Sequence, residues 1–440
     1  MKVLHVTRDC PIDSFGGTAR YVRDLILESE RLAIAGSILW LSPSPRDERT
    51  TDEGIQVRAL HLPGSRLDDP PRLFRSAVVT LLRELPGEVR IHFHTMGMGE
   101  LVVAEEARRL GLQTYFTYHS PAFSCRRDDL LIWGRDLLCD GRIRPWRCSA
   151  CGAQQQLGGP PLLGHLATAL SLSLTPLFAV LPPALRAKVA FYWQTRRFGQ
   201  RFADFLRASR GIIGCCGWSL PVLRLNGAAE SRLHHLPQGV SREFLAALQK
   251  AGPNEAGENS TDGKEFRIAC VSRISPLKGL HLLVEAFTRL PDPDLRLELM
   301  GLVERRDASW FRKKIRPHLD NDRRIGIAKP LSFLQMPEYY RSLSLLAIPS
   351  VWPETGPLVL LEAIHMETPV MGSGRVGQID LLRQWGTVVP DNTVAAWVTA
   401  LEEVIAALRR GEGLPASTGT CPLAMADVAG RMAWIYEHSR

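Results

Sequence analysis

The sequence predicts an α/β fold made of two doubly wound domains. Short apolar runs alternate with segments of helical spacing in both halves of the chain, and a polar segment rich in glycine separates the halves. A length of 440 residues is typical of two domains. The hydrophobic content of 45% and the charged content of 23% are those of a globular protein.

The first half predicts a parallel sheet that helices cover on both faces. A helix is expected after the first loop, because Ala19, Val22, Leu25 and Ile26 recur at helical spacing. Ligands of such sheets bind at the carboxyl ends of the strands. The strands are predicted at residues 3–6, 37–41, 57–60, 89–93, 114–118 and 211–214.

The same pattern restarts after residues 251–263, which we interpret as a linker or flexible loop. Strands are predicted at 266–271, 295–300, 343–348 and 369–372. We therefore expect a first domain at 1–245, with a cysteine-containing insertion near 120–200, and a second domain at 246–420. A helix within 421–440 is expected to cross back to the first domain, and the two domains are expected to face a central cleft.

The chain is basic, with a formal net charge of +8 and a pI near 9.1. This favours phosphate-bearing substrates or an anionic membrane surface, with a solvated basic surface as the alternative. Lysine and arginine are scattered, which argues against nucleic acid as a partner. The N-terminus lacks the long apolar core of a signal peptide, so we expect a cytoplasmic location with reduced cysteines.

An apolar stretch at residues 162–181 approaches the length of a membrane span. It contains polar residues and meets Pro182 and Pro183, which argues against a spanning helix. Shallow attachment to the inner face of the membrane is one interpretation. A buried helix or a cover between the domains is the other.

The strongest motif runs from Ser350 to Ala363 and contains Glu354 and Glu362. Pro357 is expected in the first turn of a helix, whose free amides make a seat for phosphate. The carboxylates would lie about 12 Å apart if the segment were helical, at ~1.5 Å per residue. A hydrolase pair needs roughly 5–9.5 Å, so this pair is better suited to gripping two parts of one extended ligand.

A second motif follows the predicted strand at 266–271. Arg273 and Lys278 lie between this strand and a helix that contains Leu282, Leu283 and Ala286. Two cations at the carboxyl end of a strand are placed to neutralise a diphosphate leaving group.

Together these motifs resemble the retaining GT-B glycosyltransferases of glycosyltransferase family four. The resemblance is strongest at residues 266–374, and Gly16-Gly17, the strand end at His119 and the segment 236–240 support it. It implies a GT-B fold and transfer of a sugar from a UDP- or GDP-linked donor to a glycan or lipid-linked acceptor. It also implies a bacterial polysaccharide or surface glycan pathway and no requirement for a catalytic metal.

The resemblance implies a role for each motif. Arg273 and Lys278 would bind the donor diphosphate, Glu354 would contact the transferred sugar, and Glu362 would hold the ribose hydroxyls. His119 would touch the sugar and the reaction centre, with a hydrogen-bonded structural histidine as the alternative. Glycine permits close approach of a ligand to the backbone. The remaining implied donor-binding residues are Gly16, Gly17, Gly356, Pro357 and Leu358.

Some residues depart from the family pattern. Thr355-Gly356-Pro357 differs from the usual Pro-Phe-Gly, and Gly377-Gln378-Ile379-Asp380 replaces a glycine-and-glutamate loop. The turn at Gly16-Gly17 is not the G-x-G-x-x-G of a dinucleotide site, so the fold class does not imply NAD. A nucleotide-sugar hydrolase or epimerase stays open, and so does a non-catalytic protein that binds nucleotide sugar or metal.

The predicted insertion carries Cys125, Cys139, Cys148 and Cys151. The spacing of Cys148 and Cys151 lets two thiolates share one tetrahedral metal, and the other two would complete a four-sulfur structural zinc site. Free buried or redox-active thiols are the alternative. The arginines around these cysteines suit an anionic acceptor or membrane, or form a solvated surface.

Overall fold

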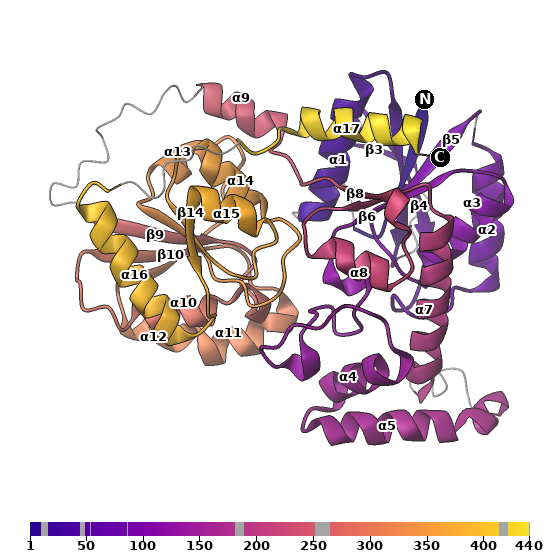
Figure 1. Ribbon diagram of the computed structural model, residues 1–440, viewed down its shortest axis with the longest axis horizontal. Coiled ribbons are helices and arrows are strands. Elements are labelled where there is room, and N and C mark those ends of the chain that lie inside the picture. Colours follow the sequence, from indigo (N-terminus) through magenta and orange to yellow (C-terminus); the bar gives the residue numbers. More distant parts are fainter. Residues whose placement is uncertain are drawn as a thin grey trace. The chain divides into compact units, whose positions relative to one another are not determined.

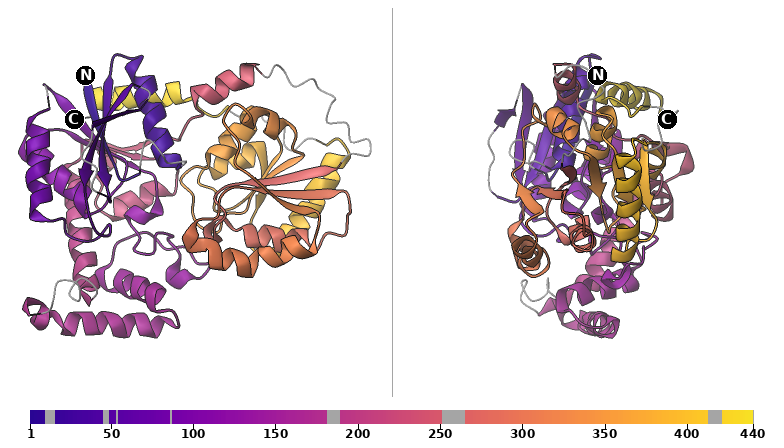
Figure 2. Two further views of the ribbon diagram at one scale, coloured as in Figure 1. Left: turned by 180° about the vertical axis from the view of Figure 1, so that it is seen from behind. Right: turned by 90° about the vertical axis from the view of Figure 1, so that its left-hand side faces the viewer.

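The computed structural model describes residues 1–9, 16–44, 49–52, 54–85, 87–180, 189–250, 265–412 and 421–439, and the predicted linker lies outside them. The chain divides into two compact units. The first unit is Met1–Pro237 with Met425–Arg440, and the second unit is Gln238–Ala424. Each unit is built on its own largely parallel sheet (Figure 1; Figure 2), which confirms the predicted α/β fold of two doubly wound domains.

The sheet of the first unit has the strand order β3-β4-β2-β1-β5-β6-β7-β8. All its neighbouring strands are parallel except β3, which pairs antiparallel with β4. The predicted strands at 89–93, 114–118 and 211–214 have the predicted bounds. The strands are β1 (Lys2–Thr7), β2 (Ala35–Ser42), β3 (Arg49–Asp52), β4 (Ile55–His61), β5 (Val89–Phe93), β6 (Thr114–Tyr118), β7 (Gly211–Gly214) and β8 (Leu233–His235).

Amphipathic helices cover this sheet. Helix α1 (Gly17–Glu30) buries Ala19, Val22, Leu25 and Ile26, which confirms the predicted helix. Helix α17 (Met425–His438) packs against α1 and so belongs to the first unit. The other helices of this unit are α2 (Arg72–Arg83), α3 (Met98–Arg109), α4 (Pro145–Leu157), α5 (Pro161–Ser173), α7 (Phe191–Ala208) and α8 (Ser219–Leu225).

The sheet of the second unit is parallel and has the order β11-β10-β9-β12-β13-β14. Its strands are β9 (Phe266–Val271), β10 (Leu295–Met300), β11 (Ile325–Ala328), β12 (Leu345–Ile348), β13 (Val370–Ser373) and β14 (Gly386–Val389). Its helices are α9 (Arg242–Lys250), α10 (Leu280–Phe287), α11 (Ala308–Lys314), α12 (Arg316–Asn321), α13 (Met336–Arg341), α14 (Leu358–His365), α15 (Ile379–Trp385) and α16 (Val394–Arg409).

The second unit begins at Gln238, a few residues before the predicted boundary at 245/246. Phe244 of α9 is buried in the core of this unit, and its ring lies edge-on to Tyr340. Val240 also forms an isolated bridge with Ala424. The buried contacts of Val240 and Phe244 therefore place the start of the second unit before the polar linker, which marked the boundary in the sequence.

Among the described residues, the helices are all too short or too polar to cross a bilayer. The apolar stretch at 162–181 forms α5, followed by a short 3-10 turn at Thr175–Ala179. Several of its leucines are exposed, so the interpretation as a buried helix is wrong for α5.

Candidate active site

The loop after β9 places Lys278 beside the loop after β12, because the two strands are neighbours in the sheet. The contact between the loops depends on Gly279, whose φ of 70° lies in the left-handed region. A Cβ at Gly279 would lie 1.8 Å from the carbonyl oxygen of Pro349. Glycine at this position therefore lets the chain bring Lys278 against the second loop.

Lys278 and Glu354 form an ion pair at this edge of the sheet. The Lys278 Nζ lies 2.9 Å from Glu354 Oε1, and the side chains are 17% and 5% exposed. The Ser350 hydroxyl donates a hydrogen bond to the same carboxylate, and the Trp352 ring centroid lies 5.9 Å from Lys278 Nζ. The pair therefore lies within reach of solvent through the lysine, while the carboxylate is buried.

A small cavity of about 10 Å³ adjoins this pair. Lys278, Ser350, Glu354 and Pro357 are among its lining residues. Helix α14 begins at Leu358, so Pro357 is the residue before the helix and not part of its first turn. No side chain of the described residues caps the start of α14, so its first amides suit an anion.

Glu362 lies inside α14 and is buried, where its carboxylate accepts a hydrogen bond of 2.8 Å from the Tyr340 hydroxyl. It does not line the small cavity with Glu354. The segment between the two glutamates is not fully helical, so the separation expected for a continuous helix does not apply.

Arg273 is half-exposed and lies outside this cavity. Its Nη1 lies 2.8 Å from Glu304 Oε1. Hydrogen bonding and attraction from Arg273 hold the pKa of Glu304 below its usual value. The structure thus brings Lys278, Glu354 and Pro357 together and gives Arg273 a carboxylate partner elsewhere.

Gln378 is a polar residue of this region whose role the sequence did not reveal. Its side chain is buried, and neither its Oε1 nor its Nε2 has a hydrogen-bond partner among the described residues. A Cβ built on Gly356 would lie 3.4 Å from this Nε2, and one on Gly377 would lie 2.0 Å from the Glu354 carbonyl oxygen. In the sequence, the departure of Gly377-Gln378 from the family pattern was the signal that could have drawn attention to this residue. The side-chain amide of Gln378 lies beside the loop of Glu354, with donors and an acceptor that a ligand could bind.

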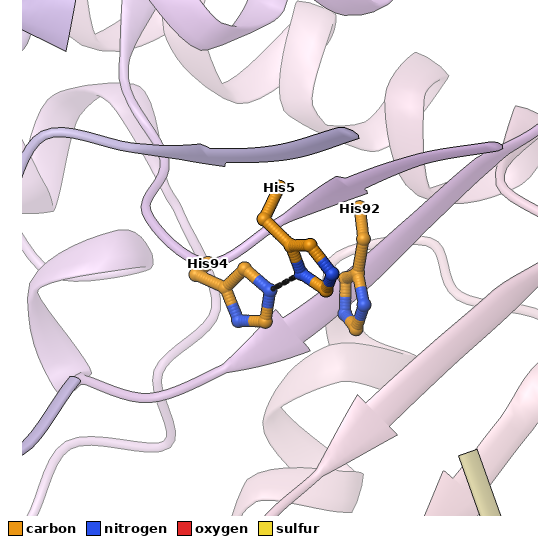
Figure 3. Close-up of side chains that lie close together, drawn as sticks. All are labelled: His5, His92 and His94. Atoms are coloured by element: carbon orange, nitrogen blue, oxygen red, sulfur yellow. Dashed lines mark hydrogen bonds between the residues drawn. The ribbon is translucent and has the colours of Figure 1, made fainter. Parts of the chain in front are cut away.

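His119 lies directly after β6 in the first unit and is buried in a row of histidines. Its Nε2 lies 3.1 Å from His94 Nδ1, and its Nδ1 lies 3.8 Å from Cys215 Sγ. Figure 3 shows the continuation of the row, where His94 Nε2 lies 2.9 Å from His5 Nδ1. Burial lowers the pKa of His119 and of His5 to about 3, so both are neutral at pH 7.

Two histidines of this row, His5 and His94, form a group with the neighbouring His92. This is the one group in the described part of the chain whose potential metal-binding atoms all lie within 4.8 Å of one another. The contacts favour hydrogen bonds instead. His92 Nδ1 lies 2.6 Å from the Tyr436 hydroxyl, and its Nε2 lies 2.8 Å from Thr117 Oγ1. Because both ring nitrogens of His92 are engaged, we interpret the row as a neutral polar network.

Gly16 and Gly17 lie at the start of α1, after β1 of the first unit. Gly16 precedes the helix with extended backbone, and a Cβ on Gly17 would meet nothing within 4 Å. Neither glycine has a left-handed backbone. Their conformation does not require glycine, and the open space at Gly17 fits close approach of a ligand.

The four predicted zinc ligands line one cavity of about 30 Å³. Backbone amides donate to Cys148 Sγ and Cys151 Sγ from Arg144 and Trp133, both at 3.3 Å, and the Arg147 guanidinium donates to Cys139 Sγ at 3.1 Å. These cysteines are not among the groups whose donor atoms lie within 4.8 Å of one another. Their sulfurs share a cavity but do not form a closed tetrahedral site. Cys215 and Cys216 are buried in the first unit, outside this cavity.

Residues 253–408 match the family model described as "Glycosyl transferases group 1". Among related proteins, a D-inositol 3-phosphate glycosyltransferase of Gordonia bronchialis is 29% identical over 198 residues, which is 42% of this chain and 42% of that protein. One of Corynebacterium glutamicum is 29% identical over 146 residues, 31% of this chain and 34% of that protein. This chain is thus aligned with less than half of each relative.

Solved structures match over the full length. Anabaena HepE in complex with UDP and glucose has a TM-score of 0.64 at 13% identity and covers 100% of both chains. Sucrose-phosphate synthase of Thermosynechococcus elongatus has a TM-score of 0.65 at 15% identity and covers 99% of this chain and 98% of its own. At such identities the likeness shows the fold. The chain therefore has the GT-B fold of two Rossmann-like units, and its second unit carries the match to the group 1 glycosyl transferases.

Proposed function

We propose that this protein transfers a sugar from a nucleotide-sugar donor to a glycan or lipid-linked acceptor, with retention of the anomeric configuration. The observation that carries the proposal is the Lys278–Glu354 pair at the carboxyl edge of the second sheet, beside the uncapped start of α14. The match of this unit to the group 1 family supports it. We assign the reaction to a bacterial polysaccharide or surface glycan pathway.

The donor diphosphate binds at Lys278 and the first amides of α14 in this proposal. A lysine ammonium acts as a compact point charge for phosphate, and a helix N-terminus adds partial positive charge. Arg273 exchanges its contact with Glu304 for the diphosphate. Because these groups neutralise the charge that develops on the leaving diphosphate, no catalytic metal is required.

The transferred sugar lies against Glu354 and Gln378, and the ribose hydroxyls bind Glu362. The buried amide of Gln378 has one acceptor and two donors with which to bind sugar hydroxyls. During transfer the bond from the anomeric carbon to the diphosphate oxygen breaks, and the diphosphate leaves with the electron pair. A bond to the acceptor oxygen forms on the same face, and the proton of the acceptor hydroxyl passes to the leaving diphosphate.

A UDP-linked donor is favoured over a GDP-linked one, because HepE, which has this fold, holds UDP or UDP-glucose in three solved structures. We assign the acceptor to the first unit, with backbone approach at Gly16 and Gly17 and His119 near the transferred sugar. His119 is neutral, because burial keeps its pKa far below 7, and a sugar hydroxyl would replace its long contact with Cys215 Sγ.

The proposal is tested by a thermal-shift screen of UDP- and GDP-sugars, followed by turnover with the donor that binds. We expect stabilisation by one nucleotide sugar and release of nucleoside diphosphate that depends on an added glycan or glycolipid. NMR of the product should show the anomeric configuration of the donor. Inversion of that configuration would contradict the retaining mechanism.

A nucleotide-sugar epimerase or hydrolase is the second candidate. A putative UDP-N-acetylglucosamine 2-epimerase of Listeria monocytogenes shares the fold, with a TM-score of 0.51 at 11% identity. Turnover of the donor without any acceptor, at the rate seen with acceptor, would favour this candidate.

We also propose that Cys125, Cys139, Cys148 and Cys151 hold a structural zinc ion, for which the loops must contract around the cavity. N–H groups donate hydrogen bonds to three of the sulfurs. Burial raises the pKa of all four thiols, so the charge of the ion itself would have to stabilise the thiolates. We expect elemental analysis to find stoichiometric zinc, lost from a Cys148→Ser, Cys151→Ser variant and retained in Cys421→Ser, where the cysteine is exposed. Purified protein that holds no zinc and melts unchanged with chelator would contradict the site.

A further inference from the structure

Helix α5 buries small and polar residues and exposes leucines, which is the reverse of an ordinary surface helix. Its buried residues are Gly164, Thr168 and Ser171. A Cβ on Gly164 would lie 2.1 Å from the carbonyl oxygen of Ala150 in α4. The helix therefore docks on α4 through small and polar residues, and its apolar side chains are left for the opposite face.

The outward face of α5 is a stripe of leucines. Leu162, Leu166 and Leu170 recur every four residues and are 63%, 57% and 58% exposed. Globular proteins bury such a stripe against their core. Other exposed apolar residues occur in the same part of the sequence, on α4, on α5 and after it: Leu157, Leu163, Leu172, Leu177 and Val180. We call this set the α5 leucine face.

Figures 1 and 2 show α5 at the outer edge of the first unit, with α4 on its inner side. An exposed stripe of leucines along one helix is typical of an interaction site. The helix has 13 residues, or about 20 Å at ~1.5 Å per residue. It is thus shorter than the ~30 Å hydrocarbon core of a bilayer and suits a position along a membrane surface.

The charge of the sequence segment that carries the leucine face favours an anionic partner, although several of its arginines pair with aspartates of the first unit. Residues 120–200 contain ten lysines and arginines and four aspartates, so they carry 10 − 4 = +6 of the chain's net charge of +8. No charged residue occurs between Arg147 and Arg186. An uncharged apolar helix flanked by basic residues complements an anionic lipid surface.

Tryptophans flank the helix as well. The Trp146 indole donates to His165 Nδ1 at 3.0 Å, and the Trp193 indole donates to Thr175 Oγ1 at 2.7 Å. The Arg196 guanidinium lies 5.3 Å from the Trp193 ring centroid. Tryptophan is enriched at the boundary between hydrocarbon and water, so its place beside α5 fits a helix at that boundary.

We propose that the α5 leucine face attaches this protein to an anionic phospholipid bilayer, with α5 along the membrane surface. The leucines enter the region below the headgroups, and the basic residues of the insertion bind the headgroup phosphates. This attachment does not depend on the proposed transfer reaction, since the residues concerned lie in the first unit, away from Lys278 and Glu354 in the sequence.

The proposal is tested by flotation of the full chain with vesicles. One set contains phosphatidylglycerol and phosphatidylcholine, and the other contains phosphatidylcholine alone. We expect binding to the anionic vesicles, weakened at 1 M salt. The variant with Leu162→Gln, Leu166→Gln and Leu170→Gln should lose at least tenfold in vesicle affinity and keep its circular dichroism spectrum, because the three side chains are exposed.

A matched control replaces three exposed leucines elsewhere in the first unit, as Leu32→Gln, Leu73→Gln and Leu110→Gln. This control should bind vesicles like the unmodified chain. Equal vesicle binding by both triple variants would overturn the proposal, and so would absence of binding by the unmodified chain. A dimer in light scattering that the α5 variant alone abolishes, without vesicle binding, would assign the face to a second copy instead.

Discussion

The two units share an architecture but differ in the polar groups that follow their strands. At the carboxyl edge of its sheet the second unit pairs Lys278 with Glu354 at 2.9 Å. The first unit has an ion pair too, Arg8–Glu100, but it also holds a row of neutral histidines, in which His94 and His119, directly after β5 and β6, hydrogen-bond with each other and with His5. The difference teaches that two Rossmann-like units need not share chemistry, because function depends on the side chains at the strand ends.

The family match falls on the second unit. Neutralising a diphosphate needs cations, so the strand edge that holds Lys278 suits donor binding. A neutral histidine row suits positioning, because it holds His119 without carrying charge into the interior. We therefore propose that the donor binds to the second unit.

The largest effect is expected for Lys278→Ala, which removes the cation from the second unit. Turnover should fall by roughly 10²–10³-fold, as when one charge-stabilising donor is lost from an active site. The measurement is nucleoside diphosphate release under saturating donor, with thermal melting to verify folding. Near-normal turnover would break the assignment of charge chemistry to this unit.

A matched control for Lys278→Ala is Arg289→Ala, which removes an exposed ion pair with Glu285 on the same unit. Exposed pairs contribute little, so turnover and melting should stay unchanged. If Lys278→Ala melts well below the parent, Lys278→Gln keeps a hydrogen-bonding side chain in place. The two variants should then show the same loss of turnover.

Acidification should destabilise the first unit more than the second. Burial lowers the pKa of His5 and His119 to about 3, and that of His92 and His94 also lies well below the usual value. Below pH ~6.5 these histidines become protonated in the unfolded chain but stay neutral in the folded protein. Stability of the first unit is therefore full above that pH and falls as pH drops, by up to about 1.4 kcal/mol per pH unit for each histidine.

Calorimetry between pH 7.5 and 5 gives the readout, because carboxylates stay mostly ionised over that range. The transition of the first unit should shift down further than that of the second, where burial lowers the pKa of His281. If histidine resonances of the folded first unit titrate near pH 6.5, the row is not held neutral and the prediction is wrong.

The smallest effect is expected for Gln378→Leu. If the buried amide binds a sugar hydroxyl, its loss should raise the donor KM about threefold to tenfold, as for one neutral hydrogen bond. The matched change Gln335→Leu alters an amide that bonds to Ser332 at the surface and should leave KM unchanged. An unchanged donor KM in Gln378→Leu would remove this residue from the sugar site.

The sequence predicted the fold well where strands are fully buried. The apolar runs at Thr114–Tyr118 and Phe266–Val271 gave correct bounds, since buried parallel strands are continuous apolar runs. β8 at Leu233–His235 was missed because it is short and half-exposed. β3 was missed as well, since its polar residues pair antiparallel at the edge of the sheet.

The candidate site was predictable in its residues but not in its contacts. Lys278 and Glu354 were identified from strand-to-helix placement, and they meet because β9 and β12 are neighbours, which is a property of topology. Contacts in the histidine row depend on β1, β5 and β6 in the same way. The start of α14 was placed one residue early, because Pro357 suits the position before a helix as well as its first turn.

The most direct test is a structure of the protein with the nucleoside diphosphate selected by the thermal-shift screen. The account predicts diphosphate oxygens within hydrogen-bonding distance of Lys278 Nζ and the first amides of α14, with Glu362 on the ribose. A nucleotide bound elsewhere, with the Lys278–Glu354 pair unchanged, would contradict it.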